Sequence, residues 1–431
     1  MNRLKYFFLI SIFFLVSFTE INLKEKNNSP SIMDKFTAPS KGDYITPLVF
    51  GINNKDSILK SIPPDLYYQI MATNFSYVGN YKKSLEYWDF QSDSNSVSLT
   101  EKDTKNLNNL SLKNAKSFII TKAKYERVIM FNEAHHMPLH RAFILSLLPE
   151  LKKQGFNYLA LEALNYLDED KLNIRKNVVY STGTYTVEPM YSELVNLALN
   201  LGFKIVSYEE KGFCSGTSME CRTKREMEQA SNLSNVFKTD SVAKMIVIAG
   251  YDHIIENNSF KMMSQYFWEK TMINPLTIDQ VDMSERSDSK YEEPVYCFIT
   301  KKYSFKEPMF AFLKDSPIVL SEKKGKVDLQ VIFPRTDFKN SRPAWVNVFQ
   351  TKNKYDLSYV SNVLNKKQWI IIQAFNLENF TNDLIPADQI AFNSSSENIS
   401  GKYLYLNKGS YLLKILTVNN EKLYEQNIKI D

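Results

Sequence analysis

The stretch "RVIMFNEAHHMPLH", residues 127–140, decides the fold because a short apolar run leads directly into a cluster of histidines. Three of the four histidines of the chain lie in it, and the fourth, His253, ends a second apolar run, "KMIVIAGYDH", at residues 244–253. Two more such runs, "NYLALEAL" at residues 157–164 and "KIVSYEE" at residues 204–210, lead into glutamates. Short apolar runs rich in β-branched residues are typical of buried strands.

The segments between these runs have a helical pattern. Apolar residues recur at every third or fourth position within residues 139–151, 188–201 and 227–237, which predicts crossover helices. "LTIDQV" at residues 276–281 is compatible with a fifth strand. Strands joined by helices form a parallel sheet with helices on both faces, so we expect an α/β fold.

Composition indicates an ordinary globular protein, because 44% of the 431 residues are hydrophobic and 23% are charged. The net charge is +5, but the 53 basic residues are interspersed with 48 acidic ones and form no dense basic block. We therefore expect a small-molecule or peptide substrate and no nucleic-acid partner.

The first residues have the pattern of an export signal. A short basic stretch, "MNRLK", precedes the apolar run "YFFLISIFFLVSF" at residues 6–18, which is too short for a comfortable membrane span. We predict a signal peptide at residues 1–22 and an exported protein in the periplasm, the cell envelope or outside the cell. An uncleaved anchor helix is the alternative. In such an oxidising compartment, Cys214 and Cys221 are placed to close a short loop as a disulfide.

Four further regions follow the signal. A polar linker is expected at residues 23–62, and a helical segment at 63–122, whose residues 67–90 resemble a single tetratricopeptide helix pair with a break at Gly79-Asn80. The α/β domain is expected at residues 123–325. Residues 326–431 contain short β runs and polar turns, which predicts an all-β, sandwich-like domain with a possible role in cell-envelope association. Its predicted strands are "VDLQVIFP", "AWVNVFQ", "QWIIIQAF", "KYLYLNKGSYLLKILTV" and "KLYEQNIKI".

Side chains that can carry chemistry follow each of the first four predicted strands of the α/β domain. Since the carboxyl ends of parallel strands meet at one edge of the sheet, we expect these side chains to lie together. They are Glu133, His135 and His136 after the first strand, Glu162 after the second, Glu209 and Glu210 after the third, and Asp252 and His253 after the fourth.

Two kinds of site fit these residues, and a hydrogen-bonded polar core without chemistry is the third interpretation. The first is a site for a divalent metal such as zinc, manganese or cobalt, with His135, Glu162 and His253 as ligands and an open position for water. The second is free of metal and uses a histidine, oriented by a glutamate, as the general base that activates water. His140 is as compatible with a structural role as with a ligand, because the glutamate of a His-Glu-x-x-His motif is missing.

Several common sites are excluded by missing motifs. The sequence contains no Gly-x-Ser-x-Gly elbow, so a serine hydrolase of the usual α/β type is unsupported. It also contains no phosphate-binding glycine-rich loop and no Cys-x-x-Cys pair. Arg225, in "TKREMEQASNL", is compatible with a plain surface charge or with an anion clamp.

Over about residues 123–285 the chain resembles the superfamily of erythromycin esterase-like, ChaN-like and TraB/Tiki proteins. The resemblance rests on "FNEAHHMPLHRAF", "YLALEAL", "GTYTVEPMYSELVNLALNLGFKIVSYEE", "REMEQASNL" and "IVIAGYDHIIE". The late Gly-x-x-His motif of the family is intact at residues 250–253, whereas Asn132 replaces the usual glycine of the early motif. His135 and His136 each match one of the family's two early spacings. Arg225-Glu226 matches the third motif, with Gln229 in place of methionine.

The resemblance implies a parallel α/β fold and three possible functions. The leading one is an exported hydrolase of an ester or peptide bond, in which His135 or His136 activates water together with Glu133. Glu162, Glu209 and His253 would complete that site, and Arg225 would hold an anionic group or the developing oxyanion. The alternative is a non-catalytic haem- or metal-binding envelope protein. A scaffold that uses its β domain for interaction is the third possibility.

Overall fold

A computed structural model of the chain describes residues 35–37, 42–92, 98–162, 164–212, 214–364, 368–378 and 380–431. The predicted signal peptide at residues 1–22 lies outside the described residues. Within the described ranges, no helix is long and apolar enough to cross a membrane.

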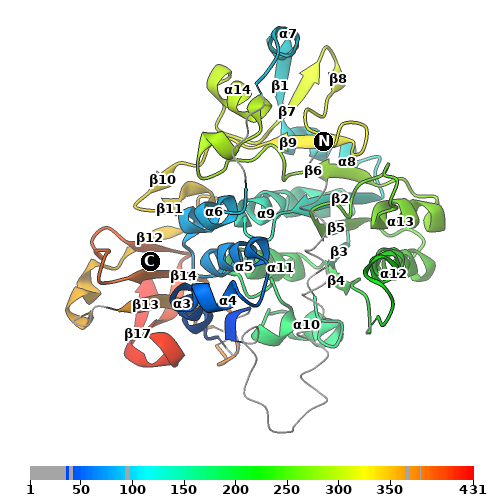
Figure 1. Ribbon diagram of the computed structural model, residues 1–431. Coiled ribbons are helices and arrows are strands. Elements are labelled where there is room, and N and C mark those ends of the chain that lie inside the picture. Colours follow the sequence, from blue (N-terminus) through cyan, green and yellow to red (C-terminus); the bar gives the residue numbers. More distant parts are fainter. Residues whose placement is uncertain are drawn as a thin grey trace.

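The predicted α/β class is confirmed by a nine-stranded, mostly parallel sheet that runs through the middle of the molecule (Figure 1). Its parallel part has the order β9-β6-β2-β5-β3-β4 and contains all five strands predicted from the sequence. These strands are β2 (Val128–Glu133), β3 (Tyr158–Leu161), β4 (Lys204–Ser207), β5 (Met245–Gly250), β6 (Leu276–Asp279) and β9 (Leu329–Ile332). An antiparallel extension beyond β9 consists of β7 (Met309–Leu313), β1 (Leu110–Asn114) and β8 (Ser316–Pro317).

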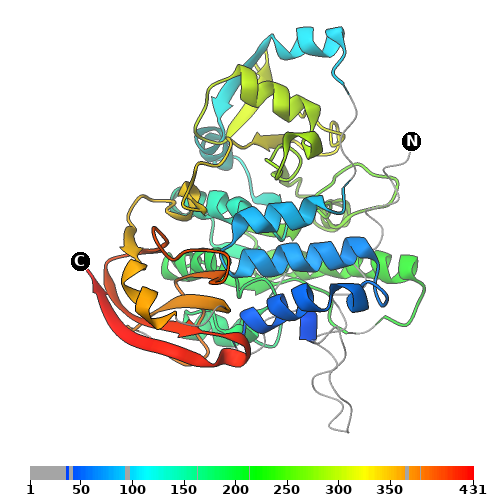
Figure 2. The ribbon, with the colours of Figure 1, turned by 60° about the vertical axis from the view of Figure 1, so that its left-hand side comes forward.

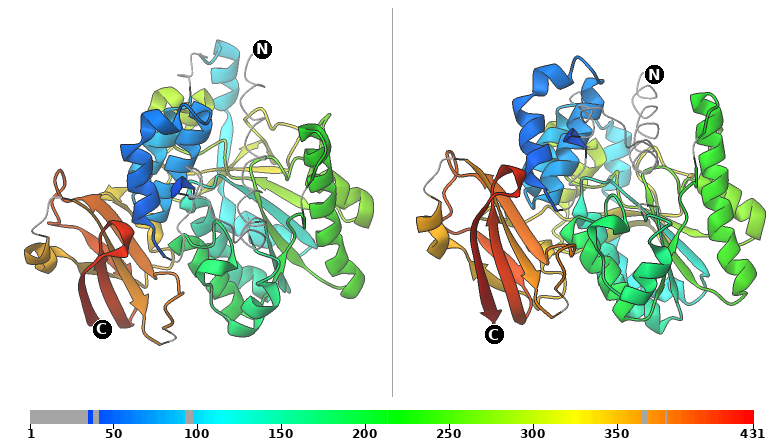
Figure 3. Two further views of the ribbon diagram at one scale, coloured as in Figure 1. Left: turned by 60° about the horizontal axis from the view of Figure 1, so that its bottom comes forward. Right: turned by 90° about the horizontal axis from the view of Figure 1, so that it is seen from below.

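Helices cover both faces of this sheet, as Figures 1 and 3 show. In β5, Ile246 and Ile248 pack with α9 (Pro138–Lys153) and α11 (Pro189–Asn200). Met245, Val247 and Ala249 point the other way, into a separate core with α12 (Ser218–Thr239) and α13 (Met263–Thr271). Because strand side chains alternate between faces, this pattern also determines the side on which each residue at the strand ends lies. The remaining helices near the sheet are α8 (Ala115–Ala123), α10 (Glu169–Arg175) and α14 (Pro294–Lys302).

The N-terminal part differs from the expected linker. The described portion of residues 23–62 contains α3 (Ile45–Asn53) and α4 (Lys55–Ile58), because apolar side chains of α3 pack into the main core. The expected helix pair forms α5 (Pro64–Tyr77) and α6 (Tyr81–Asp89), with the break at Gly79-Asn80. α7 (Glu101–Leu107) follows. The central sheet also reaches beyond the expected domain range of 123–325, since β1 and β9 lie outside it.

The C-terminal region is antiparallel and all-β, as expected. Its main sheet has the order β14-β13-β16-β17, and two short strand pairs, β12-β15 and β10-β11, accompany it. The strands are β10 (Phe338–Lys339), β11 (Arg342–Pro343), β12 (Asn353–Asp356), β13 (Trp369–Asn376), β14 (Asp388–Asn393), β15 (Tyr403–Leu406), β16 (Gly409–Leu416) and β17 (Lys422–Ile430). One predicted strand belongs to the other sheet, and one strand prediction is wrong. "VDLQVIFP" forms β9, which pairs with β6 of the central sheet. "AWVNVFQ" begins as a 3₁₀ turn, because Trp345 packs on Tyr81 of α6 with ring centroids 4.8 Å apart.

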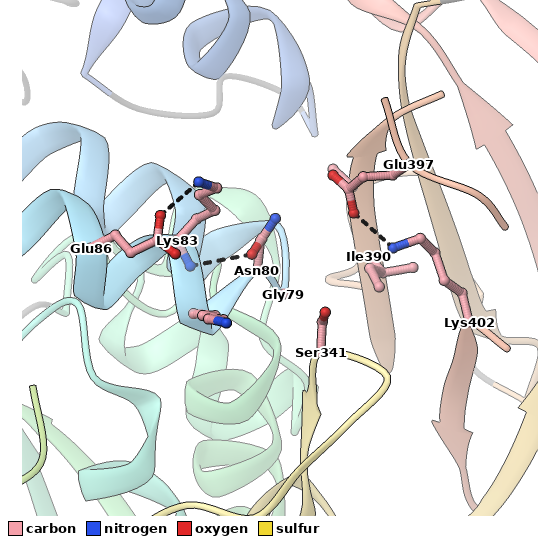
Figure 4. A pocket seen from close by; sticks show the side chains of 10 residues that line it. Gly79, Asn80, Lys83, Glu86, Ser341, Ile390, Glu397 and Lys402 are labelled. Carbon is pink, nitrogen blue, oxygen red and sulfur yellow. Dashed lines mark hydrogen bonds and ion pairs between the residues drawn. The ribbon is translucent and has the colours of Figure 1, made fainter. Parts of the chain in front are cut away.

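The helix pair is joined to this β region at the turn between α5 and α6 (Figure 2). Gln389 Nε2 donates to the Tyr77 carbonyl at 2.6 Å, and the Ala391 amide donates to the Val78 carbonyl at 2.9 Å. A hollow of about 190 Å³ lies beside this junction (Figure 4). Two of its three lysines, Lys83 and Lys402, are paired with Glu86 and Glu397. None of the predicted site residues lines it.

Candidate functional site

One half of the site lies on the α9 side of the sheet and consists of Glu133, His135 and Arg141; we call it the α9 half. Glu133 ends β2 and is only 2% exposed. Arg141, on α9, donates from Nε to Glu133 Oε2 at 2.6 Å and from Nη2 to Oε1 at 2.8 Å. Burial alone would raise the pKa of Glu133, but the charges and hydrogen bonds of Arg141 and His135 lower it to about 2. Glu133 is therefore a carboxylate at any ordinary pH.

The imidazole of His135 is oriented by this carboxylate. His135 Nδ1 lies 3.1 Å from Glu133 Oε1, so an ionised Glu133 selects the tautomer with the proton on Nδ1. Tyr185 stacks on the ring at 4.0 Å between centroids, and Tyr251 presents its ring at 84° and 5.2 Å. His135 Nε2 has no hydrogen-bond partner among the described residues, and the side chain is 14% exposed. This geometry leaves Nε2 with a lone pair that is accessible for chemistry.

The other two histidines of the cluster do not join the site. His136 points away from His135 and stacks on Trp88 of α6, with centroids 3.9 Å apart. Both of its ring nitrogens are buried without a partner in the described part of the chain, and burial and nearby cations hold its pKa well below the usual value. His136 is therefore removed from the predicted catalytic set, because consecutive side chains after the strand point in different directions. His140 is structural: its Nδ1 accepts from the Ala134 amide at 3.0 Å.

The second half lies on the α12 side, and we call it the α12 half. It consists of Glu162, Glu209, Arg225, Glu226 and His253. Arg225 lies at its centre. It donates from Nε and Nη2 to the two oxygens of Glu209, at 2.9 and 2.6 Å, and from Nη2 to Glu162 Oε1 at 2.7 Å. Gln229 also donates to Glu209, at 3.1 Å. Arg225, on α12, thus lies among the carboxylates at the strand ends and not on the open surface.

His253 is held by two carboxylates. Its Nδ1 lies 2.9 Å from Glu226 Oε2, and its Nε2 lies 3.5 Å from Glu162 Oε1. Burial would lower the pKa of His253, but Glu226 and Glu162 outweigh it and raise the pKa to about 10. His253 is thus an imidazolium near neutral pH. Arg225 Nη1 lies 3.2 Å from Nε2 and can donate to it only when the ring is neutral.

The two halves meet at Gly250, the last residue of β5. A Cβ at this position would lie 2.8 Å from His135 Cε1, 3.0 Å from His135 Nε2 and 3.2 Å from Glu162 Oε2. His135 Nε2 therefore faces Glu162 across a residue that has no side chain. The Gly250 amide also donates to Glu162 Oε2. Only glycine permits this close approach.

The residues present do not fit the predicted divalent metal. The Arg225 guanidinium takes the position between Glu162, Glu209 and His253 that a cation would need, and Glu162 Oε2 is bound to the Gly250 amide. Within the described ranges, no group of three or more histidine, cysteine, aspartate or glutamate side chains is arranged to hold a metal ion. The predicted ligand set of His135, Glu162 and His253 is therefore not assembled around a common point.

Three contributors were not expected from the sequence. Arg141 carries no recognisable signal, since arginine is rarely fully buried; it also contacts Glu188, 3.3 Å away. Glu226 was recognised only as part of a family motif, without a role. Asn132, which replaces the usual glycine, donates from Nδ2 to the Tyr251 carbonyl and to Asp279 Oδ1, both at 2.7 Å. Its side chain thus ties together the ends of three neighbouring strands.

The loop before α12 also holds the α12 half in place. Cys214 and Cys221 form a disulfide that closes this loop one helical turn before Arg225. Lys224 Nζ pairs with Glu210 Oε1 at 2.6 Å, so Glu210 is taken up by a neighbouring lysine and does not enter the site.

Comparison with known proteins does not establish a family. No protein-family model and no curated protein matches the chain. Among solved structures, the type III effector HopBA1 has a TM-score of 0.29 and 12% identity, over 43% of this chain and 94% of that one. ChaN of Campylobacter jejuni, solved with cofacial heme binding, has a TM-score of 0.29 and 15% identity, over 40% of this chain and 88% of that one.

A third similar structure is RRSP, a MARTX toxin effector domain from Vibrio vulnificus CMCP6. Its TM-score is 0.28 and its identity 16%, over 55% of this chain and 49% of that one. A ChaN protein is thus among the similar structures. At these identities and TM-scores the similarities carry no conclusion about activity.

Proposed function

We propose that the protein is an exported hydrolase that cleaves an ester or peptide bond without a bound metal. The single observation that carries the proposal is the His135 imidazole, which contacts the buried Glu133 through Nδ1 and faces Glu162 across Gly250 with Nε2. His135 offers a free Nε2 lone pair, whereas His253 is held protonated by Glu226 and Glu162. An imidazole that is oriented by a carboxylate at one nitrogen and unengaged at the other has the arrangement expected of a general base.

His135 acts as the general base in this proposal. Its Nε2 accepts a proton from water as the water oxygen forms a bond to the carbonyl carbon. Glu133 accepts a hydrogen bond from Nδ1–H and stabilises the imidazolium that results. Arg141 keeps Glu133 ionised and in place. The bond to the leaving group then breaks, and the leaving oxygen or nitrogen takes the proton from His135.

His253 supplies the positive charge for the developing oxyanion. Its ring lies beside Glu162, which faces His135 Nε2 across Gly250, so the ring acts there through its charge and its two nitrogens stay engaged by Glu226 and Glu162. Arg225 has most of its donors engaged by Glu162 and Glu209, so we assign it the role of holding these carboxylates, in place of an anion clamp.

The charges favour a neutral carbonyl substrate over a phosphate ester. In the α12 half three carboxylates face two cations, Arg225 and His253, which leaves one net negative charge. A phosphate group would be repelled by this excess. The Cys214–Cys221 disulfide supports export, because such bonds persist in oxidising compartments.

A panel of p-nitrophenyl acyl esters and fluorogenic peptides tests the proposal. We expect the purified protein to hydrolyse at least one class, and His135→Asn to lower kcat/KM by about 10²–10⁴-fold, the usual contribution of a general base. His136→Phe is the matched control, because it keeps a ring on Trp88 and removes a histidine that lies outside the site. Equal activity of wild type and His135→Asn would refute the assignment.

The haem-binding alternative predicts a different outcome of the same variant. His135 Nε2 is the one imidazole nitrogen, of the four histidines described, that is uncommitted and not fully buried. If the protein binds haem and has no turnover, titration with haemin should produce a Soret band that His135→Asn abolishes, while no ester or peptide is cleaved.

A further inference from the structure

A row of aromatic rings connects the N-terminal helix pair to His135. Trp88, on α6, stacks in parallel on Tyr251, with ring centroids 5.9 Å apart and 10° between planes. Tyr251 in turn presents its ring to His135 at 5.2 Å. Trp88 lies outside the range of the family resemblance, in a segment that the sequence connects only with packing. The contact therefore adds a second region of the chain to the site.

Tyr251 has an unusual backbone that this arrangement holds in place. Its φ is +40°, a region that non-glycine residues rarely adopt. Its amide donates to the Glu133 carbonyl at 3.1 Å, and its carbonyl accepts from Asn132 Nδ2 at 2.7 Å. Its hydroxyl is hydrogen-bonded to the His135 backbone. Strained residues of this kind persist where their surroundings over-determine them, and they cluster at functional sites.

Trp88 is itself fixed from both sides along α6. One turn earlier, Ser84 Oγ donates to the His136 carbonyl at 2.8 Å. One residue later, Asp89 pairs with Arg286 and accepts from the Ser287 amide at 2.7 Å. Helix α6 is thus anchored on both sides of Trp88. Ser84 contacts the turn after β2, and Asp89 contacts the segment after β6. Trp88 has little freedom to leave Tyr251.

We infer that Trp88 is a positioning residue, which holds the His135 ring against Glu133 through Tyr251, so that the N-terminal helix pair is a working part of the site. The inference rests on the proposed function only for its kinetic consequence. Among the described residues, the ring of His135 has one hydrogen-bond partner, Glu133. Its orientation therefore depends on Tyr185 on one face and on Tyr251 at the edge.

The test compares Trp88→Leu, Trp88→Phe and Trp268→Leu in the full chain. Trp268 is the control, because it is 46% exposed on α13 and takes no part in the row of rings. The first readout needs no substrate: ¹⁵N NMR of histidine-labelled protein reports the tautomer of each ring. We expect a single Nδ1–H tautomer for His135 in wild type, Trp88→Phe and Trp268→Leu, and a mixture of both tautomers in Trp88→Leu.

The second readout is hydrolysis of p-nitrophenyl acetate. We expect kcat to fall about tenfold in Trp88→Leu with KM little changed, since misplacement of a catalytic group affects the chemical step. Trp88→Phe should restore most of the rate. In the double variant with Tyr251→Leu, loss of Trp88 should cost little more, because both residues act on His135 through one path.

The outcomes separate this inference from the proposed function. An unchanged His135 tautomer in a folded Trp88→Leu protein overturns the inference, whatever the activity. Absence of hydrolysis in the wild type, with the tautomer mixture present in Trp88→Leu, refutes the hydrolase and retains the positioning role. If Trp88→Leu does not fold, Tyr251→Leu tests the same row of rings and leaves the helix pair intact.

Discussion

The α9 half and the α12 half use the same residue types, a histidine beside a glutamate and an arginine, for opposite purposes. In the α9 half, Arg141 engages Glu133, so the glutamate shares its charge between the arginine and His135. In the α12 half, Arg225 engages Glu162 and Glu209, and Glu226 is left to act on His253. The first histidine keeps a free nitrogen, whereas the second is held as a cation. The position of the arginine relative to the glutamate thus differs between the two halves, and the contacts of the histidine differ with it.

The largest expected effect comes from breaking the buried pair of the α9 half. Glu133→Ala leaves Arg141 buried without its main partner, so the free energy of unfolding should fall by about 3–5 kcal/mol. Glu209→Ala, whose side chain is 23% exposed in the α12 half, should cost less, about 1 kcal/mol. Urea unfolding measures both. The double variant Glu133→Leu/Arg141→Leu is the control and should be more stable than Glu133→Ala. If the double variant loses as much unfolding free energy as Glu133→Ala, the pairing of Glu133 with Arg141 is contradicted.

The next effect comes from separating the two halves. Gly250→Ala places a Cβ against His135 and Glu162, so one of them must shift. A displacement of this kind can lower the rate about 10²-fold, and we expect that loss in kcat for the ester probe. Gly325→Ala, where an added Cβ meets nothing within 4 Å, is the matched control. Full activity of Gly250→Ala would mean that the halves do not act together.

A smaller effect distinguishes the four histidines without any substrate. Diethyl pyrocarbonate acylates an accessible, unprotonated imidazole nitrogen. We expect His135 to be labelled at least about tenfold faster than the others at pH 7, since His136 and His140 are buried and His253 is protonated. Peptide mapping by mass spectrometry measures the rates. Faster labelling of His136 than of His135 would reverse the assignment of the reactive histidine.

The last effect is the pH dependence of stability, with a limiting slope of about 1.4 kcal/mol per pH unit for each histidine involved. The raised pKa of His253 means that its contribution is complete below about pH 6.5 and is lost as the pH rises through about 10. The pKa of His140 is lowered to about 4, so the unfolded chain binds a proton that the folded chain does not as the pH falls from 6.5 to 4. The pKa of His136 is also lowered by burial, so this histidine likewise reduces stability as the pH falls below 6.5.

Stability should therefore be greatest near pH 6.5. Urea unfolding between pH 4.5 and 9.5 would measure both slopes. His253→Gln should flatten the alkaline slope, and His140→Gln the acidic one. Unchanged slopes in both variants would show that other groups govern the pH dependence.

Most of the central sheet could be predicted from the sequence, because the five apolar runs are short, buried and separated by helical patterns. The sequence predicts β9 as a strand but places it in the C-terminal region, because "VDLQVIFP" is equally suited to either sheet and only its pairing with β6 decides. The sequence predicts a linker where α3 and α4 form, because their apolar side chains are buried only by a core made of segments far along the chain. Local patterns identify strands and helices, but not their partners.

The candidate site could be predicted only in part. The sequence predicts Glu133, His135, Glu162, Glu209, Arg225 and His253. The structure joins them in two groups, Glu133 with His135 and the other four around Arg225, and His135 and Glu162 meet at Gly250. The metal interpretation was wrong about geometry, because a cluster of histidine and carboxylate residues in the sequence does not reveal that an arginine lies among them. His136 was indistinguishable from His135 by spacing alone.

By itself the sequence determined the α/β class and the residues that reach the carboxyl edge of the sheet, because apolar periodicity and position after a strand are properties of neighbouring residues. Only the tertiary structure decided which of two adjacent histidines faces Glu162, which arginine neutralises which glutamate, and that Trp88 supports the site from another region. These outcomes depend on side-chain direction and on contacts between segments that are distant in the chain, and neither is encoded in a local pattern.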